Sequence, residues 1–439
     1  MFEIKAREKM VERALLVGAY TDSSARDEAD DLLTELGELV RTLGIPVVER
    51  QLVFHRESHA KLLMGTGKAQ EIADFIKENT CDVVIFDNQL TPAQQRNWEE
   101  LTGVTVADRQ EIILDIFGLR ARTREARIQV DLARMAYSLP RLTRAWSHLG
   151  QQGGGIGAKG EGESQLEQDK RAIRGQIDRL KKELLSVRRA RATQRKDRKR
   201  TPVPNAAIVG YTNAGKSSLL RRLTGADVLV EDKLFATLDT TTRKVALPNK
   251  QPLLLTDTVG FVRKLPHQLV ESFNATLEEA TMSDFLIHVL DASHPRVVEF
   301  YNTTNSVLRD LGANSLPTVV VFNKMDCVED PATKAILRNQ FPGALFISVH
   351  SGEGLDRLIE RLAELVSGQA ADLELKIPAA RADLIARLHR EAVVHSIEYA
   401  DATVSISATV PARSVEAFTA FRVASNASPG AESTLAKAP

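Results

Sequence analysis

The sequence predicts an α/β protein in four folded parts. These are a small N-terminal α/β domain, a coiled-coil-like helical hairpin, a second α/β domain with a mostly parallel sheet, and a small α+β appendage. Strand and helix patterns alternate in residues 1–118 and again in residues 201–368, which is typical of parallel sheets with covered faces. Two apolar seams in residues 119–200 predict the hairpin. Residues 369–423 return to a short strand, a helix with Leu384, Leu388 and Val393, a strand around Thr403–Val410 and a last helix. The Ala-, Ser- and Pro-rich residues 424–439 are expected to be disordered.

The composition excludes several classes of protein. The 439 residues are 43% hydrophobic and 26% charged, as in ordinary soluble domains. The two cysteines, Cys81 and Cys327, are too few for a disulfide framework or a cysteine-rich zinc site. No apolar run approaches the roughly 20 residues that span a bilayer. We therefore expect a cytoplasmic protein and exclude secreted, membrane-spanning and collagen-like classes.

The N-terminal domain begins with a buried strand over Ala14–Tyr20 and a helix over Arg26–Leu43. The further predicted elements are a helix over Gly67–Asn79, a strand over Cys81–Asp87, a helix over Thr91–Leu101 and a strand over Val104–Asp108. Met64-Gly-Thr-Gly-Lys68 has some likeness to a phosphate loop but lacks the full spacing. We interpret it as a glycine turn rather than a second nucleotide site.

The hairpin is predicted from apolar residues that recur at alternating spacings of four and three. The first seam comprises Ile128, Leu132, Met135, Leu139, Leu142, Trp146 and Leu149, and the second Ile173, Ile177, Leu180, Leu184 and Val187. Pro140 should kink or locally unwind the first helix. The connection Gly150–Gly162 is too glycine-rich for regular structure, and Arg195–Pro204 reads as a polar linker.

The hairpin also concentrates positive charge. The whole chain has 58 Lys and Arg against 58 Asp and Glu, but residues 120–200 hold 22 against 9, a net +13. The outer faces are expected to carry Arg120, Arg122, Arg124, Arg127, Arg134, Arg141, Arg144, Lys170, Arg171, Arg174, Arg179, Lys181, Lys182, Arg188 and Arg189. Such a patch favours folded RNA as a partner, and the few aromatic residues argue against single-strand stacking. The alternative is a solvated coiled coil whose charges keep it soluble.

A phosphate-binding motif opens the second α/β domain. An apolar strand over Ala206–Val209 leads into G-x-x-x-x-G-K-S, and a helix follows. In this motif backbone N–H groups surround the phosphates, the lysine reaches the outer phosphates and the serine hydroxyl binds Mg²⁺. The predicted nucleotide-binding residues are Gly210, Tyr211, Thr212, Asn213, Ala214, Gly215, Lys216 and Ser217.

Two later motifs complete a guanine-nucleotide site. A buried strand ends in an acid suited to the Mg²⁺ side, followed by a glycine that can sense the γ-phosphate: Asp257, Thr258, Val259 and Gly260. A further strand leads into Asn323, Lys324, Met325 and Asp326, whose carboxylate can accept two hydrogen bonds from guanine and none of that kind from adenine. The last base-contacting loop is expected at Ser348, Val349 and His350. GTP is the predicted ligand.

The segment Phe235–Arg243 (FATLDTTTR) lies between the phosphate loop and Asp257 and is rich in hydroxyl groups. One threonine here should complete the Mg²⁺ shell when the γ-phosphate is present, which would make the segment nucleotide-sensitive. The alternative is an ordinary threonine-rich connection.

Together GYTNAGKS, FATLDTTTR, DTVGF, NKMD and the segment GGGIGAKGEGESQLEQDKR resemble the HflX family of translation-associated GTPases over residues 10–365. The resemblance implies a GTPase that binds the large ribosomal subunit and splits or rescues ribosomes under stress. It also implies that Phe235, Ala236, Thr237, Leu238 and Asp239 lie in the GTP site, with Thr237 joining Ser217 as a Mg²⁺ ligand. The chain departs from the family pattern at Glu161, Ser164, Thr240 and Val349.

The hydrolytic step is the least defined part of the prediction. Many GTPases have a water-orienting glutamine directly after the motif glycine, but this chain has Phe261. We expect slow intrinsic hydrolysis that a partner stimulates, and assign no catalytic residue beyond phosphate stabilisation by Lys216. Asn213 either coordinates K⁺, as the asparagine of cation-activated GTPases does, or stabilises the loop.

Two other classes of function remain open at this stage. One is a GTPase subunit of a tRNA-modifying enzyme, which would need a partner enzyme. The other is a GTP-dependent regulator that uses the hairpin to bind a protein without RNA. For the ribosomal interpretation we expect a monomer that acts on the large subunit.

Overall fold

The computed structural model describes residues 12–144, 159–199, 203–225, 234–235, 237–238, 240–249, 251–264, 280–368, 370–400 and 402–423. Two compact units make up the chain. The first comprises residues 1–191, 206–243 and 255–353, and the second comprises residues 192–205, 244–254 and 354–439. The predicted tail, 424–439, lies outside the described residues.

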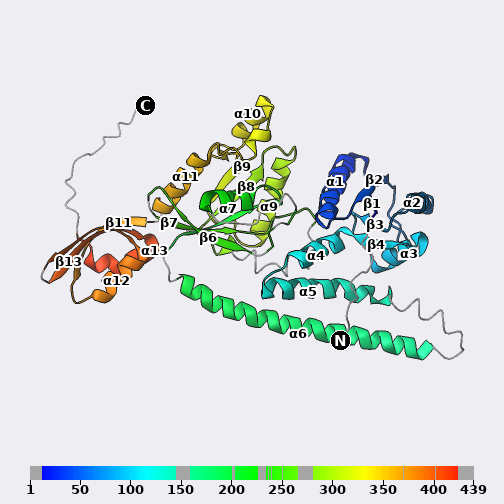
Figure 1. Ribbon diagram of the computed structural model, residues 1–439, viewed down its shortest axis with the longest axis horizontal. Helices are drawn as coiled ribbons and strands as arrows, with labels where there is room; N and C mark the ends of the chain where they lie inside the picture. Colours follow the sequence, from blue (N-terminus) through cyan, green and yellow to red (C-terminus); the bar gives the residue numbers. More distant parts are fainter. Residues whose placement is uncertain are drawn as a thin grey trace, which may run out of the picture. The chain divides into compact units, whose positions relative to one another are not determined.

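The N-terminal domain is a four-stranded parallel sheet with helices between the strands (Figure 1). Its strands are β1 (Ala14–Tyr20), β2 (Val47–Phe54), β3 (Val83–Phe86) and β4 (Thr105–Asp108), in the order β2-β1-β3-β4. Its helices are the short η1 (Ser23–Ala25), then α1 (Arg26–Thr42), α2 (Thr66–Glu78), α3 (Pro92–Thr102) and α4 (Arg109–Arg120). Leu16 pairs with Ile85 at the centre of the sheet.

Local chemistry explains the helix boundaries. Thr91 caps α3 through a reciprocal capping box with Gln94, and α3 ends at Gly103, which has φ 72°. Asp108 ends β4 and accepts a hydrogen bond from the N–H of Glu111, so it also caps α4. Of the segment interpreted as a glycine turn, only Met64 and Gly65 precede α2; Thr66, Gly67 and Lys68 already form its first turn, so that interpretation is wrong for most of the segment.

Strand β2 was not predicted from the sequence. It is an edge strand that pairs only with β1 in the described sheet, and its side chains are mostly half-buried or exposed. Glu49, Arg50 and Gln51 interrupt its apolar residues, so neither a buried run nor a clean alternation marks it.

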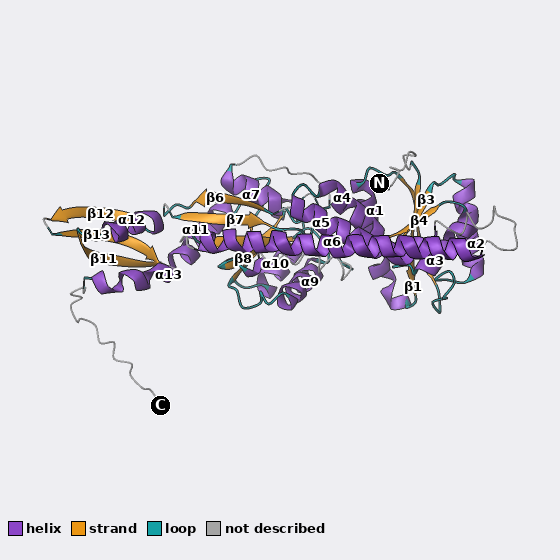
Figure 2. Ribbon diagram, turned by 90° about the horizontal axis from the view of Figure 1, so that it is seen from below, coloured by secondary structure: helices purple, strands orange, loops and turns teal. Residues whose placement is uncertain are grey.

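The helical module consists of α5 (Arg124–Ser138), η2 (Leu139–Arg144) and α6 (Lys159–Lys199). In both ribbon views α5 lies alongside α6 (Figure 2). Arg124 of α5 forms an ion pair with Glu183 of α6. The predicted unwinding at Pro140 is confirmed, because the chain continues there as a 3₁₀ segment.

Two expectations for this module are wrong. Helix α6 begins at Lys159, inside the stretch expected to lack regular structure, and runs to Lys199, across half of the expected linker. Strong helix formers such as Glu, Gln, Lys, Arg and Ala dominate residues 159–199, and they outweigh the glycines. The predicted loop residues 150–158 lie outside the part of the chain that the structure describes.

Arg141 was expected on an outer face, and this is also wrong. Its guanidinium is largely buried against the N-terminal domain, where it donates to Gln95 Oε1 at 2.9 Å and to the Leu90 carbonyl at 2.8 Å. It lies 3.6 Å from the Asp108 carboxylate and 3.6 Å above the Tyr137 ring. Arg141 therefore anchors η2 and does not contribute to a surface patch.

The central domain holds a six-stranded sheet in the order β10-β9-β8-β5-β7-β6. Its strands are β5 (Asn205–Gly210), β6 (Thr241–Ala246), β7 (Pro252–Asp257), β8 (Phe285–Asp291), β9 (Thr318–Asn323) and β10 (Leu345–Phe346). Its helices are α7 (Lys216–Thr224), α9 (Val297–Asp310), η3 (Met325–Cys327) and α10 (Pro331–Gln340). The pairs β5–β8, β8–β9 and β9–β10 are parallel, so their carboxyl ends share one edge. The fold class predicted from the sequence is confirmed.

One hydrophobic core spans the N-terminal and central domains. Its buried side chains include Leu16 and Phe117 from the first domain and Tyr211, Phe235 and Leu286 from the second. Because these residues form one cluster, the two domains share packed apolar surface and not only a polar contact.

In the second unit, α11 (Leu355–Gly368) precedes a three-stranded antiparallel sheet in the order β11-β13-β12. The elements of this C-terminal domain are β11 (Ala370–Pro378), α12 (Ala382–Glu391), β12 (Val393–Ala400), β13 (Thr403–Pro411), α13 (Ala412–Val415) and η4 (Glu416–Phe421). Leu384 and Leu388 pack in its core as expected. Val393 was assigned to the helix, but it begins β12, another polar edge strand that sequence analysis missed.

Candidate nucleotide-binding site

The predicted phosphate loop connects β5 to α7 at the carboxyl edge of the central sheet. Gly210 has φ 145°, and a Cβ there would lie 2.1 Å from the Val289 carbonyl oxygen. Gly215 has φ 95°, and a Cβ there would lie 2.3 Å from Nδ2 of Asn323. Both positions therefore need glycine, which lets the loop fold tightly before the helix N-terminus at Lys216.

Lys216 is buried at the base of this loop, where its Nζ donates to the Tyr211 carbonyl at 2.7 Å. Burial lowers the pKa of Lys216 to about 8, and the nearby Asp257 carboxylate partly opposes this shift. Burial also raises the pKa of Asp257, against the opposing effect of Lys216. The ammonium group is thus poorly solvated, and phosphate oxygens would replace the water that it lacks.

The side chains expected to bind magnesium lie together. Ser217 Oγ is 2.7 Å from Thr237 Oγ1 and donates to Asp257 Oδ2 at 2.5 Å. Asp257 Oδ1 is buried and has no hydrogen-bond partner among the described residues. Two hydroxyl oxygens beside a carboxylate with a spare buried oxygen suit Mg²⁺, which prefers oxygen ligands and retains several waters. Mg²⁺ held by Ser217 and Thr237, with Asp257 beside it, would supply positive charge next to the β- and γ-phosphates.

The segment after Asp257 lies directly on the phosphate loop. Thr258 Oγ1 donates to the Ile208 carbonyl at 2.7 Å, and Val259 is buried. The N–H of Phe261 donates to the Gly210 carbonyl at 3.1 Å, and the N–H of Thr212 donates to the Phe261 carbonyl at 2.8 Å. Gly260 is therefore held against the loop, on the side where a γ-phosphate would lie.

The base-recognition loops are joined through Asn323. Its Nδ2 donates to the Ala214 carbonyl at 2.9 Å, and its Oδ1 accepts from the N–H of Val349 at 3.0 Å. This side chain therefore connects the phosphate loop to the last base loop. The backbone N–H of Val349 makes this bond whatever the side chain at position 349, and its contact with the base stays a prediction.

Asp326, the acid predicted to read guanine, is exposed beside these loops. Hydrogen bonding from Ser348 lowers the pKa of Asp326, so its carboxylate stays ionised and able to accept from guanine. Ser348 and Met325 are buried, His350 is exposed, and Lys324 pairs with Asp291 at 2.7 Å.

Phe235 and Leu238 have a different environment from the one their assignment to the GTP site suggests. Both side chains are buried in the shared core, and the Phe235 ring packs edge-on against Phe117 of α4, with centroids 4.7 Å apart. Thr237, between them, faces Ser217. Ala236 and Asp239 lie outside the described residues. The exposed Asn213 adopts φ 59° at the tip of the phosphate loop.

The comparisons with known proteins agree with this geometry. Residues 30–118 match the family model of the GTP-binding GTPase N-terminal region, and residues 120–198 match that of its middle region. Residues 205–324 match the 50S ribosome-binding GTPase family. The chain is 50% identical over 423 residues to the GTPase HflX of Akkermansia muciniphila, covering 94% of this chain and 97% of the relative. The chain belongs to the HflX family of GTPases.

Other members of the HflX family match at similar coverage. The GTPase HflX of Escherichia coli is 40% identical over 403 residues, covering 91% of this chain and 94% of the relative. A GTP-binding protein from Sulfolobus solfataricus, solved with GDP, is 25% identical with a TM-score of 0.43, covering 81% of this chain and 98% of that chain. Like other HflX GTPases, the protein takes GTP as its substrate and hydrolyses it. The family is ribosome-associated. Among the described residues, no helix is long and apolar enough to cross a membrane.

Sequence reasoning missed a group of residues that surrounds the γ-phosphate side of the site. The Tyr211 hydroxyl donates to Glu35 of α1 and accepts from the backbone N–H of Arg263, and the Arg263 side chain also donates to Glu35. No spacing rule connects these positions, because Glu35 and Tyr211 are 176 residues apart. The only signal in the sequence was the pair of basic residues, Arg263 and Lys264, that follows Phe261.

Proposed function

We propose that the protein binds the large ribosomal subunit through its basic N-terminal module and uses GTP binding and hydrolysis to split or rescue ribosomes under stress. The observation that carries the proposal is the presence in one chain of the GTP site and a long helix covered with exposed basic side chains. Membership of the HflX family supports the same function. The proposal places the protein in the cytoplasm and treats it as a monomer off the ribosome.

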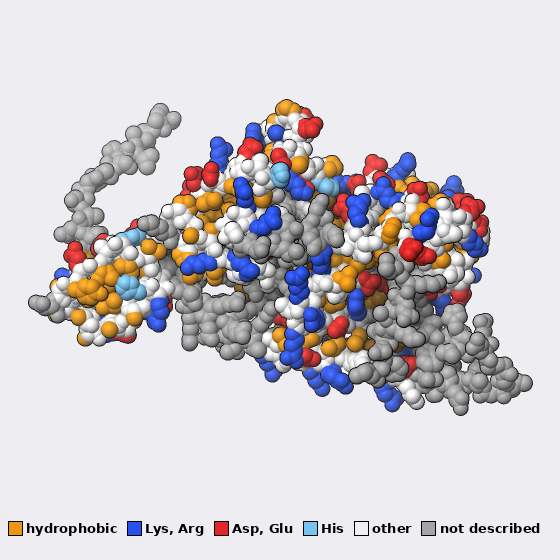
Figure 3. All heavy atoms as spheres, in the orientation of Figure 1, with side chains coloured by type: hydrophobic (Ala, Val, Ile, Leu, Met, Phe, Trp, Pro, Cys, Tyr) orange, Lys and Arg blue, Asp and Glu red, His pale blue; other side chains and the backbone are white. Residues whose placement is uncertain are grey.

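The exposed surface of α6 supports binding to RNA. Exposed basic residues on its described part are Arg171, Arg174, Arg179, Lys181, Lys182 and Arg189. Figure 3 shows Lys and Arg side chains gathered along the described part of α5 and α6. Ile177 and Leu184 are buried on the other side of α6, so the basic face is the solvent face. Phosphate contacts from such a face would make binding strongly dependent on salt.

Sedimentation tests this proposal. The protein is mixed with 70S ribosomes or separated subunits, with a GTP analogue, GDP or no nucleotide, over a series of salt concentrations. We expect binding to the large subunit that is strongest with the analogue, and loss of the 70S peak. Absence of ribosome binding in every nucleotide state contradicts the proposal but leaves the GTPase activity intact.

A charge-reversal pair identifies the binding surface. Arg179→Glu with Lys182→Glu should weaken ribosome binding and reduce the salt slope by about one unit per lost phosphate contact. The matched control is Arg309→Glu with Arg338→Glu, which makes the same charge change on exposed positions of α9 and α10. Equal effects from the two pairs would show that net charge matters, and not the face of α6.

Potassium activation is part of the same proposal. The Phe261 side chain is buried and has no polar atom to orient water, so hydrolysis needs charge from elsewhere. Asn213 is exposed at the tip of the phosphate loop, where its oxygen could bind K⁺ beside the leaving phosphate. Replacing K⁺ with Na⁺ should slow GTP turnover in the wild-type protein and have no effect on Asn213→Ala. Equal wild-type rates in both salts would contradict the K⁺ role.

The two alternative functions predict other partners. A subunit of a tRNA-modifying enzyme should bind tRNA in preference to ribosomes, and a regulator of a protein partner should bind with little salt dependence. Family membership does not favour either one. Adding tRNA as a competitor in the sedimentation assay distinguishes the first of them.

A further inference from the structure

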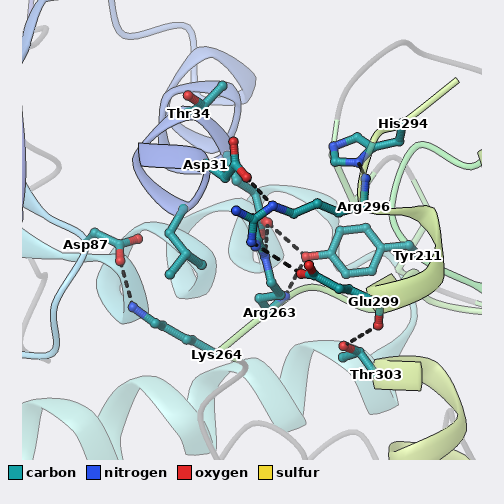
Figure 4. Close-up of polar contacts among 12 residues, drawn as sticks. Asp31, Thr34, Asp87, Tyr211, Arg263, Lys264, His294, Arg296, Glu299 and Thr303 are labelled. Carbon is teal, nitrogen blue, oxygen red and sulfur yellow. Dashed lines mark hydrogen bonds and ion pairs between the residues drawn. The ribbon is translucent and has the colours of Figure 1, made fainter. Parts of the chain in front are cut away.

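Tyr211, in the phosphate loop, joins three parts of the first unit (Figure 4). Its ring stacks on Phe300 of α9, with centroids 3.9 Å apart and planes 3° from parallel. Its hydroxyl donates to Glu35 Oε2 of the N-terminal domain at 2.8 Å and accepts from the backbone N–H of Arg263 at 2.7 Å. Through one hydroxyl group, the phosphate loop is bound both to the segment after Gly260 and to helix α1.

The same segment makes two ion pairs with the N-terminal domain. Arg263 Nε lies 3.1 Å from Glu35 Oε2, and Lys264 Nζ lies 2.9 Å from Asp87 Oδ2. Arg109 connects the two acids inside the N-terminal domain, at 3.2 Å from Glu35 Oε1 and 3.1 Å from Asp87 Oδ1. The N-terminal domain thus presents two carboxylates with one internal cation, and the central domain supplies two more cations.

Burial gives this network energetic weight. Glu35 is 8% exposed, Asp87 is 4% exposed and Tyr211 is 5% exposed. Burial, reinforced by Glu35, raises the pKa of Tyr211. Its hydroxyl therefore stays protonated and donates a hydrogen bond to the Glu35 carboxylate. Removing one partner from a buried charged network leaves the others poorly solvated, which costs far more than breaking an exposed pair.

The arrangement that this network holds leaves little space at Gly260. A Cβ built on Gly260 would lie 2.8 Å from Lys216 Nζ and 2.8 Å from Thr212 Cα. In GTPases of this type the γ-phosphate contacts both the motif glycine and the phosphate-loop lysine. Admitting a γ-phosphate between Gly260 and Lys216 therefore requires the segment to move away from the loop, whereas GDP has no γ-phosphate to place there.

We propose that Glu35 is a specificity-determining residue for the GTP site. Through Tyr211 and Arg263 it holds residues 258–264 against the phosphate loop, and this lowers the affinity for GTP relative to GDP. The coupling between two contacts is reciprocal. GTP must therefore weaken the contact between the central domain and α1 by the same factor by which that contact lowers the affinity for GTP relative to GDP. The N-terminal domain and the γ-phosphate thus compete for the position of one short segment.

Nucleotide affinities of Glu35→Gln and Tyr211→Phe test the proposal. Affinities for GDP and for a non-hydrolysable GTP analogue are measured by titration with fluorescent nucleotides. The ratio of analogue affinity to GDP affinity should rise at least about fivefold in each variant, the lower end of typical coupling between sites. In the double variant the two effects should be less than additive, because Tyr211→Phe removes the hydrogen bond that Glu35→Gln weakens.

Asp31→Asn is the matched control. Asp31 lies one turn before Glu35 on α1 and pairs with Arg296, so it belongs to the same domain contact without touching the phosphate loop (Figure 4). Its affinity ratio should equal that of the wild type. A ratio that rises equally in Asp31→Asn and Glu35→Gln would overturn the proposal, because the effect would then come from loosening the domains in general.

A second readout follows from reciprocity. Hydrogen–deuterium exchange in α1 of the wild-type protein should be faster with the GTP analogue than with GDP, and Tyr211→Phe should reduce this difference. If Glu35→Gln fails to fold, Tyr211→Phe alone decides the question, because it removes a hydroxyl and keeps the ring on Phe300. An unchanged ratio in Tyr211→Phe, or equal exchange with both nucleotides, refutes the proposal.

Discussion

The two ends of the GTP site are built differently. At the guanine end, Asn323 bonds to Ala214 and Val349, and every partner belongs to the central domain. At the γ-phosphate end, the segment after Asp257 is bound through Arg263 and Lys264 to carboxylates of the N-terminal domain. Recognition of the base should therefore be independent of the rest of the protein, while the response to the third phosphate should depend on it.

The largest effect is expected at the guanine end. Asp326→Asn removes the carboxylate that is predicted to accept two hydrogen bonds from the base, each worth about 1.5–3 kcal/mol when one group is charged. GTP and GDP should therefore both bind about 10²–10⁴-fold more weakly, by the same factor. Titration with both nucleotides measures this. A loss confined to GTP would show that the two ends of the site are coupled after all.

Lys216→Ala should have the next largest effect, because Lys216 Nζ lies beside Gly260 on the phosphate side of the site. Loss of its ammonium group should lower the rate of GTP hydrolysis by about 10²–10³-fold, as expected for one stabilising group at developing charge. Single-turnover kinetics at saturating GTP separates this from weaker binding. A decrease in affinity with an unchanged single-turnover rate would restrict Lys216 to binding.

Nucleotide affinity should depend on pH through the same lysine. Burial lowers the pKa of Lys216 to about 8 in the free protein, and phosphates favour its charged form. Binding must then include proton uptake above pH 8, so GTP affinity should fall as pH rises from 7 to 9, approaching tenfold per unit. The stability of the free protein should depend on pH in the opposite direction. Between pH 8 and 10.5 the lysine binds more protons in the unfolded protein, so its contribution to the free energy of unfolding rises with pH.

Lys216→Arg provides the control for the pH profile, since arginine stays charged over this range. Its affinity for GTP should be weaker than that of wild type but nearly constant from pH 7 to 9. An identical slope in both proteins would assign the titration to another group.

The smallest effect is expected at the rim of the domain contact. Arg296 and Asp31 form a partly exposed ion pair, with side chains 18% and 40% accessible. Arg296→Ala should reduce the free energy of unfolding by about 1 kcal/mol or less, as for other exposed pairs, and should leave the preference between GTP and GDP unchanged. Urea denaturation with a parallel nucleotide titration measures both. A clear change in nucleotide preference would extend the coupled network beyond Glu35.

Sequence reasoning brought together the residues predicted to bind phosphate and magnesium. Ser217 and Asp257 come after strands at motif spacings, whereas Thr237 was placed by the resemblance to the HflX family. In the structure Ser217 Oγ lies within hydrogen-bond distance of both Thr237 Oγ1 and Asp257 Oδ2. Their roles as ligands remain predictions. Motif spacing works here because the carboxyl ends of parallel strands share one edge of a sheet.

What sequence reasoning missed has two physical causes. The strands β2 and β12 both lie at the edges of their sheets, where half-exposed side chains dilute the apolar pattern that marks a buried strand. Glu35 was missed because its role depends on tertiary contact, and on its own helix it reads as one more acid on a polar face. The exposure of Arg141 was predicted wrongly for the same reason, since only the tertiary contacts show that its side chain faces inward.

The core shared by the N-terminal and central domains has a consequence for biosynthesis. Phe117 leaves the translating ribosome 118 residues before its partner Phe235, a delay of roughly 5–25 s at ordinary elongation rates. During that interval the apolar surface of the N-terminal domain that later packs against the central domain is exposed to solvent. Chaperones that bind apolar surface can therefore bind the nascent chain at this stage. The acids Glu35 and Asp87 do not stay unpaired during that interval, because Arg109 of the same domain forms ion pairs with both.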